Sequence, residues 1–256
     1  MKLIDTHAHL FADEFKDDLA NVVNRAKQAG VQCVIQPNID AESIEALKNS
    51  VREYPDFFIP MMGLHPTSVA EDWRQQLDTV GEELSRTKYI AVGEIGLDLY
   101  WDRTFEQEQI EVFETQLKWS AEKNLPVSIH SRNAIWEVCR SIKKVGIASL
   151  RGIFHSFGGN VEELDAILDL KNFHIGINGV VTFKKSGLSE TLQHCDLSHI
   201  VLETDSPYLA PVPYRGKRNE SAYLKEIVQK LSEIYGKTTE EIANITTENA
   251  KQVFGI

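Results

Sequence analysis

The sequence predicts an α/β fold, and within that class a TIM-like (β/α)8 barrel with additional C-terminal helices. Short apolar runs alternate with segments of helical period along the chain. The length of 256 residues is typical of a single barrel. Histidines and carboxylates also stand at one end of successive apolar runs. Because the carboxyl ends of parallel strands meet on one face of a barrel, this placement predicts a single pocket built from the whole chain.

Eight strands are predicted from alternating or continuous apolar runs, near residues 2–8, 31–36, 57–62, 89–94, 126–130, 150–155, 173–177 and 199–203. Helical periodicity predicts helices over 17–29, 41–53, 73–85, 105–123, 134–144 and 161–170, and more weakly near 187–195. Beyond Tyr208 we expect helices over 220–234, from Thr238 with a capping box to Glu241, and over 247–254. No linker-like segment divides the chain, so residues 1–256 are predicted to form one domain.

Composition limits the compartment and the partners. Three scattered cysteines give no disulfide framework, and the N-terminus enters strand-like residues without a signal peptide. We therefore expect a cytoplasmic protein with no membrane contact and no obligate protein partner. The net charge of -11 argues against binding nucleic acid through a broad basic surface. Nucleic acid stays possible as a substrate, because an enzyme needs only a local positive site.

Six side chains at predicted strand ends are candidate metal ligands: His7, His9, Glu94, His130, His155 and Asp205. Two histidines two residues apart face the same side of an extended strand, although such a pair alone is also compatible with ordinary histidines. Imidazoles and carboxylates without thiolates suit Mg, Mn, Zn, Co or Ni. Six ligands exceed what one catalytic ion with an open position takes, so we expect two divalent cations bridged by a carboxylate. Glu94 is the expected bridge.

Further side chains are predicted around these ligands. Asp205 is a candidate to orient or deprotonate the attacking water, although a carboxylate there could also cap a turn. Glu203 and Asp5 share strand parity with ligand positions and are candidates to hydrogen-bond a histidine, or else plain core polar residues. His65 follows the third strand and is a candidate substrate contact and catalytic residue, with a simple turn histidine as the alternative.

Loops after the predicted strands carry cations and aromatic side chains. Candidate contacts to a charged backbone are Arg132, Lys184, Lys185, Arg215, Lys217 and Arg218, with a solvated basic turn as an equal alternative for the lysine pair and the last three. Candidates to stack on an unpaired base, or to pack the barrel mouth, are Tyr100, Trp101, Phe157 and Tyr208. Trp119 and Trp136 lie within predicted helices and are interpreted as core residues.

The motifs together resemble those of the TatD family of metal-dependent deoxyribonucleases, within the amidohydrolase superfamily. They are Asp5-Thr6-His7-Ala8-His9-Leu10, Gly63-Leu64-His65-Pro66, Gly93-Glu94-Ile95-Gly96-Leu97-Asp98, His130-Ser131-Arg132, His155-Ser156-Phe157, Glu203-Thr204-Asp205-Ser206-Pro207-Tyr208-Leu209 and the extension 211–219. The resemblance implies a TIM-like barrel with two divalent ions that hydrolyses phosphodiesters, usually as a 3′-to-5′ exonuclease on DNA. It assigns one ion to His7, His9, Glu94 and Asp205, and the other to Glu94, His130 and His155. Gly158-Gly159-Asn160 departs from the family, which usually carries a serine there.

We therefore predict a metal-dependent deoxyribonuclease whose substrate is DNA, as single strands or 3′ ends. The predicted catalytic residues are Glu94, Asp205, Glu203 and His65, and the predicted substrate contacts are His65, Arg132, Tyr208, Arg215 and Lys217. One alternative is an amidohydrolase-type enzyme that acts on a small amide, ester or lactone, although many such barrels bridge their metals with a carbamylated lysine. The other is a non-catalytic metal-stabilised scaffold, although structural metal sites are usually closed and four-coordinate.

Overall fold

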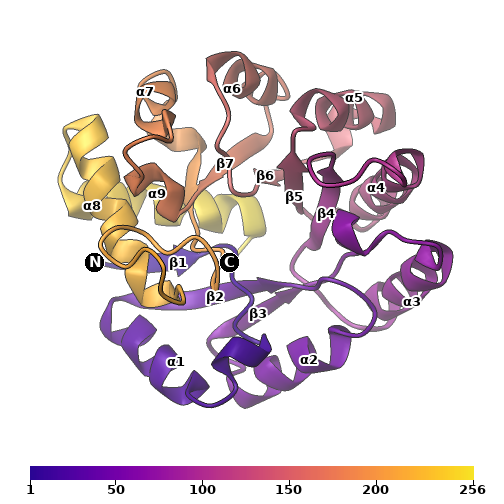
Figure 1. The fold of residues 1–256 in the computed structure, drawn as a ribbon, viewed down its shortest axis with the longest axis horizontal. Helices are drawn as coiled ribbons and strands as arrows, with labels where there is room; N and C mark the ends of the chain where they lie inside the picture. Colours follow the sequence, from indigo (N-terminus) through magenta and orange to yellow (C-terminus); the bar gives the residue numbers. More distant parts are fainter.

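The computed structural model describes residues 1–256 and has a ring of strands at its centre (Figure 1). Paired strands all run parallel. The eight strands are β1 (Leu3–Asp5), β2 (Val31–Pro37), β3 (Phe58–Met61), β4 (Val92–Asp98), β5 (Val127–Arg132), β6 (Gly152–Phe154), β7 (Phe173–Ile177) and β8 (Ile200–Leu202). This α/β architecture confirms the predicted fold class.

The ring consists of two sheets joined by hydrogen bonds across two seams. One sheet has the order β1-β2-β3 and the other β4-β5-β6-β7-β8. Between β3 and β4, the backbone N–H of Met62 donates to Ala91 at 3.2 Å, and a parallel bridge pairs Met62 with Val92. Between β8 and β1, the N–H of Thr6 donates to Leu202 at 3.0 Å. Backbone contacts therefore continue around the whole ring.

Helices surround the strands on the outside of the ring (Figure 1). The helices bury apolar stripes toward the interior of the protein, and α1, for example, buries Val22, Val23 and Ala26. None of them combines the length and apolar character needed to cross a membrane. The helices are α1 (Leu19–Gln28), α2 (Ile44–Glu53), α3 (Trp73–Arg86), α4 (Glu106–Lys123), α5 (Ile135–Val145), α6 (Val161–Leu168), α7 (Leu188–Leu192), α8 (Leu224–Tyr235) and α9 (Thr239–Phe254).

Helix α9 closes the amino end of the barrel. Its residues Ala250, Val253 and Phe254 form one buried apolar cluster with strand residues such as Ile4 and Val201. Two polar contacts hold it there: the Thr247 hydroxyl donates to the carbonyl of Lys2 at 3.0 Å, and the Asn249 amide donates to that of Ile200 at 2.8 Å. The other end of the barrel is thereby left as the open face.

Several predicted boundaries shift by a few residues, and two predictions were wrong in a larger way. Strand β4 extends from Val92 to Asp98 instead of ending at Glu94, because Ile95 and Leu97 continue its buried apolar pattern. Glu94 therefore lies inside a strand. The two predicted terminal helices are one helix, α9. The adjacent threonines near its middle do not interrupt it, since the hydroxyl of Thr246 donates to the carbonyl of Ile242 one turn earlier at 2.8 Å.

Candidate metal centre

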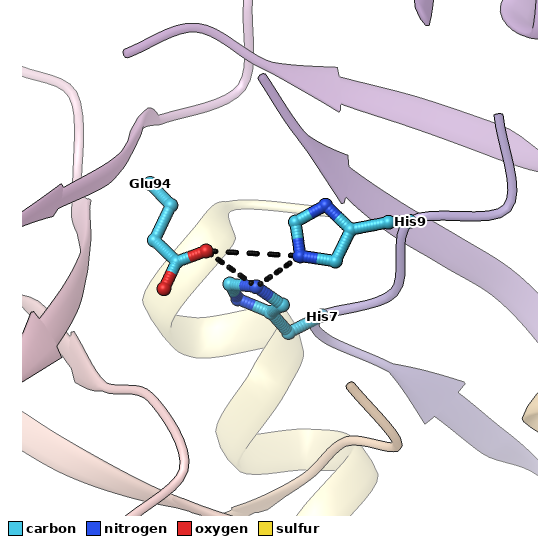
Figure 2. A group of neighbouring side chains, drawn as sticks. All are labelled: His7, His9 and Glu94. Carbon is cyan, nitrogen blue, oxygen red and sulfur yellow. Dashed lines mark hydrogen bonds and ion pairs between the residues drawn. The ribbon is translucent and has the colours of Figure 1, made fainter. Parts of the chain in front are cut away.

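Two histidines directly after β1 meet a carboxylate from β4 at the open face (Figure 2). The Nε2 atoms of His7 and His9 are 3.3 Å apart, and Glu94 Oε2 lies 3.0 Å from the first and 3.7 Å from the second. All three residues are buried. The segment is held in line because the N–H of Ala8 donates to β2 and that of His9 donates to the carbonyl of Ser206 at 2.7 Å. The two imidazoles therefore face the same point, as their spacing predicts.

The second oxygen of Glu94 faces a different group of histidines. Glu94 Oε1 lies 3.0 Å from Nδ1 of His130, 3.3 Å from Nε2 of His65 and 3.8 Å from Nε2 of His155. This side is more open: the side chain of His130 is 18% exposed, whereas that of His7 is 0% exposed. Glu94 thus stands between the fully buried His7 and the more exposed His65 and His130.

Asp205 reaches the cluster from the segment after β8. Its Oδ1 lies 3.6 Å from His155 Nε2 and 3.7 Å from His9 Nε2. The residue has φ 58, a left-handed conformation that aspartate tolerates better than most residues. Its N–H donates to the carbonyl of His7 at 2.9 Å, which fixes this turn against β1. The structure therefore brings all six predicted ligands into one cluster.

Polar partners behind the cluster orient three imidazoles. His7 Nδ1 lies 3.2 Å from the Ser128 hydroxyl, and His130 Nε2 lies 3.0 Å from Asp98 Oδ2. His155 Nδ1 lies 3.0 Å from Glu203 Oε1, an ion-pair distance without the geometry of the hydrogen bond expected of Glu203. In each pair the partner engages one ring nitrogen and leaves the other toward the cluster, as in many metal sites.

Glu203 fits behind His155 because residue 176 of β7 has no side chain. An ideal Cβ on Gly176 would lie 2.1 Å from Glu203 Oε2. The other oxygen of this fully buried carboxylate also accepts the backbone N–H of Ser156 at 2.5 Å. Any larger residue at position 176 would displace the carboxylate from His155.

Two partners were missed, and the structure decides between the two alternatives left open for Asp5. Asp98 shares strand parity with Glu94, and Ser128 shares it with His130, so periodicity in β4 and β5 was the available signal. Asp5 does not contact the ring of His7. Its carboxylate instead accepts the Thr204 hydroxyl at 2.7 Å and ties β1 to the end of β8, while burial raises its pKa to about 6.

The electrostatics of the cluster suit a bound cation. Burial lowers the pKa of His9 to about 4 and that of His7 well below its usual value, so both imidazoles are neutral and can donate a lone pair. Burial opposes charge on the other side too, but Asp98 and Glu94 raise the pKa of His130 to about 9. The nearby Glu203 and Asp205 carboxylates likewise raise the pKa of His155 to about 10. A metal cation that bound to these two rings would displace a proton from each of them.

Interatomic spacing gives an independent test of fit. Two donor atoms that share an ion at about 2.1 Å each are separated by roughly 3.0 to 3.4 Å. The His7–His9, His7–Glu94 and His130–Glu94 separations of 3.3, 3.0 and 3.0 Å match this spacing, whereas His9 lies farther, at 3.7 Å, from both Glu94 and Asp205. The atom His9 Nδ1 is buried without a partner, so the polar contacts of this ring are all made by Nε2, which faces the cluster. The residues present therefore fit divalent cations.

The cluster lies in a cavity of about 730 Å³ whose rim carries several predicted substrate contacts. His65, Arg132 and Tyr208 all line this cavity. The guanidinium of Arg132 lies 4.1 Å from the ring centre of Tyr100 and 5.1 Å from that of Trp101. Trp101, at 74% exposure, also lines the cavity. We call this side of the cavity the aromatic wall; it consists of Tyr100 and Trp101 together with Arg132, which lies over both rings.

Other predicted contacts lie farther away. Arg215 lines a neighbouring hollow, whereas Lys217 lines neither that hollow nor the cavity. Arg218 pairs with Asp18 at 2.7 Å, which makes it part of the contact between two segments of the fold. Trp136 is 52% exposed and is not the core residue expected from its helix.

Comparison with known proteins agrees over almost the full chain. A family model described as TatD related DNase matches residues 4–255. The uncharacterized metal-dependent hydrolase YabD of Bacillus subtilis is 37% identical over 255 residues, or 99% of each chain. The 3′-5′ ssDNA/RNA exonuclease TatD of Pectobacterium parmentieri is 32% identical over 260 residues, covering 98% of this chain and 99% of that protein. The crystal structure of YJJV, a TatD homologue from Escherichia coli, is 28% identical with a TM-score of 0.92, covering 99% of this chain and 98% of the other. By sequence, fold and motifs alike, this chain belongs to the TatD-related DNase family.

Proposed function

We propose that the protein is a divalent-metal-dependent phosphodiester hydrolase that acts on DNA as a 3′-to-5′ exonuclease, on single strands or 3′ ends. The observation that carries the proposal is that the two oxygens of Glu94 lie closest to different histidines, His7 and His130, at one open cavity. A carboxylate between two cations about 3.5–4 Å apart is the arrangement of two-metal phosphoesterases. Family membership and the relative named as an exonuclease support the substrate class.

In this proposal two cations, from among Mg, Mn, Zn, Co and Ni, bind at each subunit. His7, His9, Glu94 and Asp205 hold one, and Glu94, His130 and His155 hold the other. When bound, such cations neutralise charge on the phosphate and lower the pKa of water.

Asp205 is the proposed general base. Burial, together with the nearby Glu94 and Glu203 carboxylates, raises its pKa to about 7, although His155 acts in the opposite direction. A carboxylate beside the attacking water is placed to accept its proton, and a cation bound next to Asp205 would lower this pKa. Asp205 takes a proton from water while the water oxygen bonds to phosphorus. The P–O ester bond then breaks, the departing oxygen takes up a proton from solvent water, and Asp205 releases its own proton to solvent.

The remaining residues orient the reactants. Glu203 holds the ring of His155 through Nδ1 and acts as a positioning residue. Arg132 and His65 line the cavity and are proposed to donate hydrogen bonds to phosphate oxygens. Tyr208 is proposed to contact the sugar or base of the terminal nucleotide.

A substrate panel tests the proposal. Purified protein is assayed with a chromogenic phosphodiester, single-stranded DNA, duplex DNA, RNA, and a set of amides, esters and lactones, each with several divalent cations. We expect turnover of the phosphodiester and of single-stranded DNA, and its loss with EDTA. Turnover of an amide or lactone without phosphodiester cleavage would overturn the proposal in favour of another amidohydrolase activity. A single-stranded oligonucleotide labelled at either end distinguishes 3′-to-5′ trimming from internal cleavage.

A further inference from the structure

A second hollow lies beside the cavity that contains the metal cluster, by which we mean the six candidate metal ligands. We define the basic hollow by Lys184, Lys185 and Arg215, which line a space of about 600 Å³. Val180 lines both spaces, so the two are neighbours. The basic hollow is formed by the loops after β7 and after β8, on the same face as the cluster.

The three cations of the basic hollow have no carboxylate partners. Lys184, Lys185 and Arg215 are exposed and form no ion pair, whereas Arg218 nearby in the sequence is paired with Asp18. The protein as a whole has a net charge of -11. Three like charges around one space repel one another, and a bound polyanion relieves that repulsion. The basic hollow is thus a local positive site on an acidic protein.

The walls of the basic hollow are held by contacts within the protein. The N–H of Val212 donates to the Thr182 hydroxyl at 2.9 Å, which joins the two loops. They also approach closely at Gly179, where an ideal Cβ would lie 2.1 Å from the carbonyl oxygen of Leu209. The guanidinium of Arg215 lies 4.2 Å from the ring centre of Phe183. A site with fixed walls loses less conformational entropy when its ligand binds.

We infer that the basic hollow binds a backbone phosphate of an oligonucleotide whose scissile phosphate occupies the cavity of the metal cluster. This inference rests on the proposed function and adds a preference for chain length. Lysine and arginine contacts to phosphates are independent of base sequence. Substrates long enough to span both spaces therefore bind more tightly than a dinucleotide or a small phosphodiester, whatever their bases.

A length series tests the preference. Single-stranded DNA from a dinucleotide to a hexanucleotide is hydrolysed by the wild type and by a variant with Lys184→Gln, Lys185→Gln and Arg215→Gln. For the wild type we expect kcat/KM to rise with length and then level off. In the variant the rise should shrink on the order of tenfold, through KM. An unchanged length profile would overturn the inference and leave the proposed function intact.

The matched control removes equal charge from the opposite end of the barrel. Lys88, Lys123 and Lys143 are exposed, form no ion pair, and lie before β4, at the end of α4 and near the end of α5. Changing all three to glutamine should preserve the wild-type length profile. A profile that flattens equally in this control would show that general charge, and not the basic hollow, sets the preference.

A binding measurement provides a readout that does not depend on activity. A fluorescently labelled single-stranded hexanucleotide is titrated in EDTA and followed by anisotropy. We expect the basic-hollow variant to bind on the order of tenfold more weakly, and the slope of log Kd against log salt to fall by about 0.7 for each phosphate that the variant no longer neutralises. Equal affinity and equal salt slopes in wild type and variant would overturn the inference even if no phosphodiester were cleaved.

Discussion

The metal cluster and the basic hollow are neighbours on one face, yet they are built in opposite ways. In the cluster, buried side chains from several strands converge on one carboxylate. The carboxylate of Glu94 lies within 4 Å of five imidazoles, those of His7, His9, His65, His130 and His155. In the basic hollow, exposed cations on two loops lie around open space. From this contrast we expect the cluster to act as a unit that one substitution disables, whereas rim residues should contribute separately and by small amounts.

The largest expected effect is at the centre of the cluster. Glu94→Ala or Glu94→Gln should reduce phosphodiester hydrolysis by roughly a thousandfold or more, because both histidine groups lose their shared carboxylate. Bound metal, measured on dialysed protein, should fall as well, while circular dichroism reports a folded barrel. Glu42→Gln, at an exposed and unpaired glutamate, is the control. Retained activity in Glu94→Gln would contradict the bridging role.

A smaller effect on activity is expected at Glu203, which lies behind the candidate ligand His155. Glu203→Gln should weaken metal affinity and activity by about 10- to 100-fold, because His155 loses the carboxylate that orients its ring. Added metal should restore part of the activity, which a purely structural defect would not show. Gly176→Ala reaches the same contact from β7 without removing a charge, since its Cβ would displace Glu203. Unchanged metal affinity in both variants would show that Glu203 does not position His155.

At the rim the effect should appear in substrate binding. Trp101→Ala removes an exposed ring from the aromatic wall and should raise KM for single-stranded DNA by about 5- to 100-fold, the range expected for stacking on one base. KM for a phosphodiester without a base to stack should change less. Trp136→Ala is the matched control, because Trp136 is also exposed but does not line the cavity. Equal losses in the two variants would exclude base stacking at Trp101.

The smallest effect is expected at Arg218. Arg218→Gln removes the pair with Asp18, whose side chain is 32% exposed, so we expect a loss of about 0.2–1 kcal/mol in the free energy of unfolding. Denaturant titration at low and high salt measures it, and the loss should shrink at high salt. A raised KM for DNA in this variant would instead indicate that Arg218 contacts the substrate.

The cluster could be predicted from sequence because it depends on strand position. Histidines and carboxylates that follow apolar runs must meet when parallel strands form a ring, so His7, His9 and Asp205 could be placed without coordinates. Asp98 was missed because the predicted strand ends at Glu94, although Ile95 and Leu97 continue the apolar pattern of β4 beyond it.

The rim could not be predicted in the same detail. Loop residues have no period, and neighbours along the chain diverge: Arg215 lines the basic hollow, Lys217 lies outside it, and Arg218 is paired with Asp18. Trp136 was interpreted as core from its helix, but an amphipathic helix also has an outer face. Which cations stay unpaired depends on how distant segments pack together, and the sequence does not state this.

The contact between α9 and the start of β1 has a consequence for biosynthesis. Thr247 and Lys2, which it joins, are 245 positions apart. During translation, β1 is therefore complete long before the ribosome has made α9, the helix that closes the amino end of the barrel. Until then Ile4 and Val201 have no apolar cover from Phe254 and its neighbours. Chaperone protection during translation should matter most in that interval, and a premature stop before Thr239 should yield an aggregation-prone product.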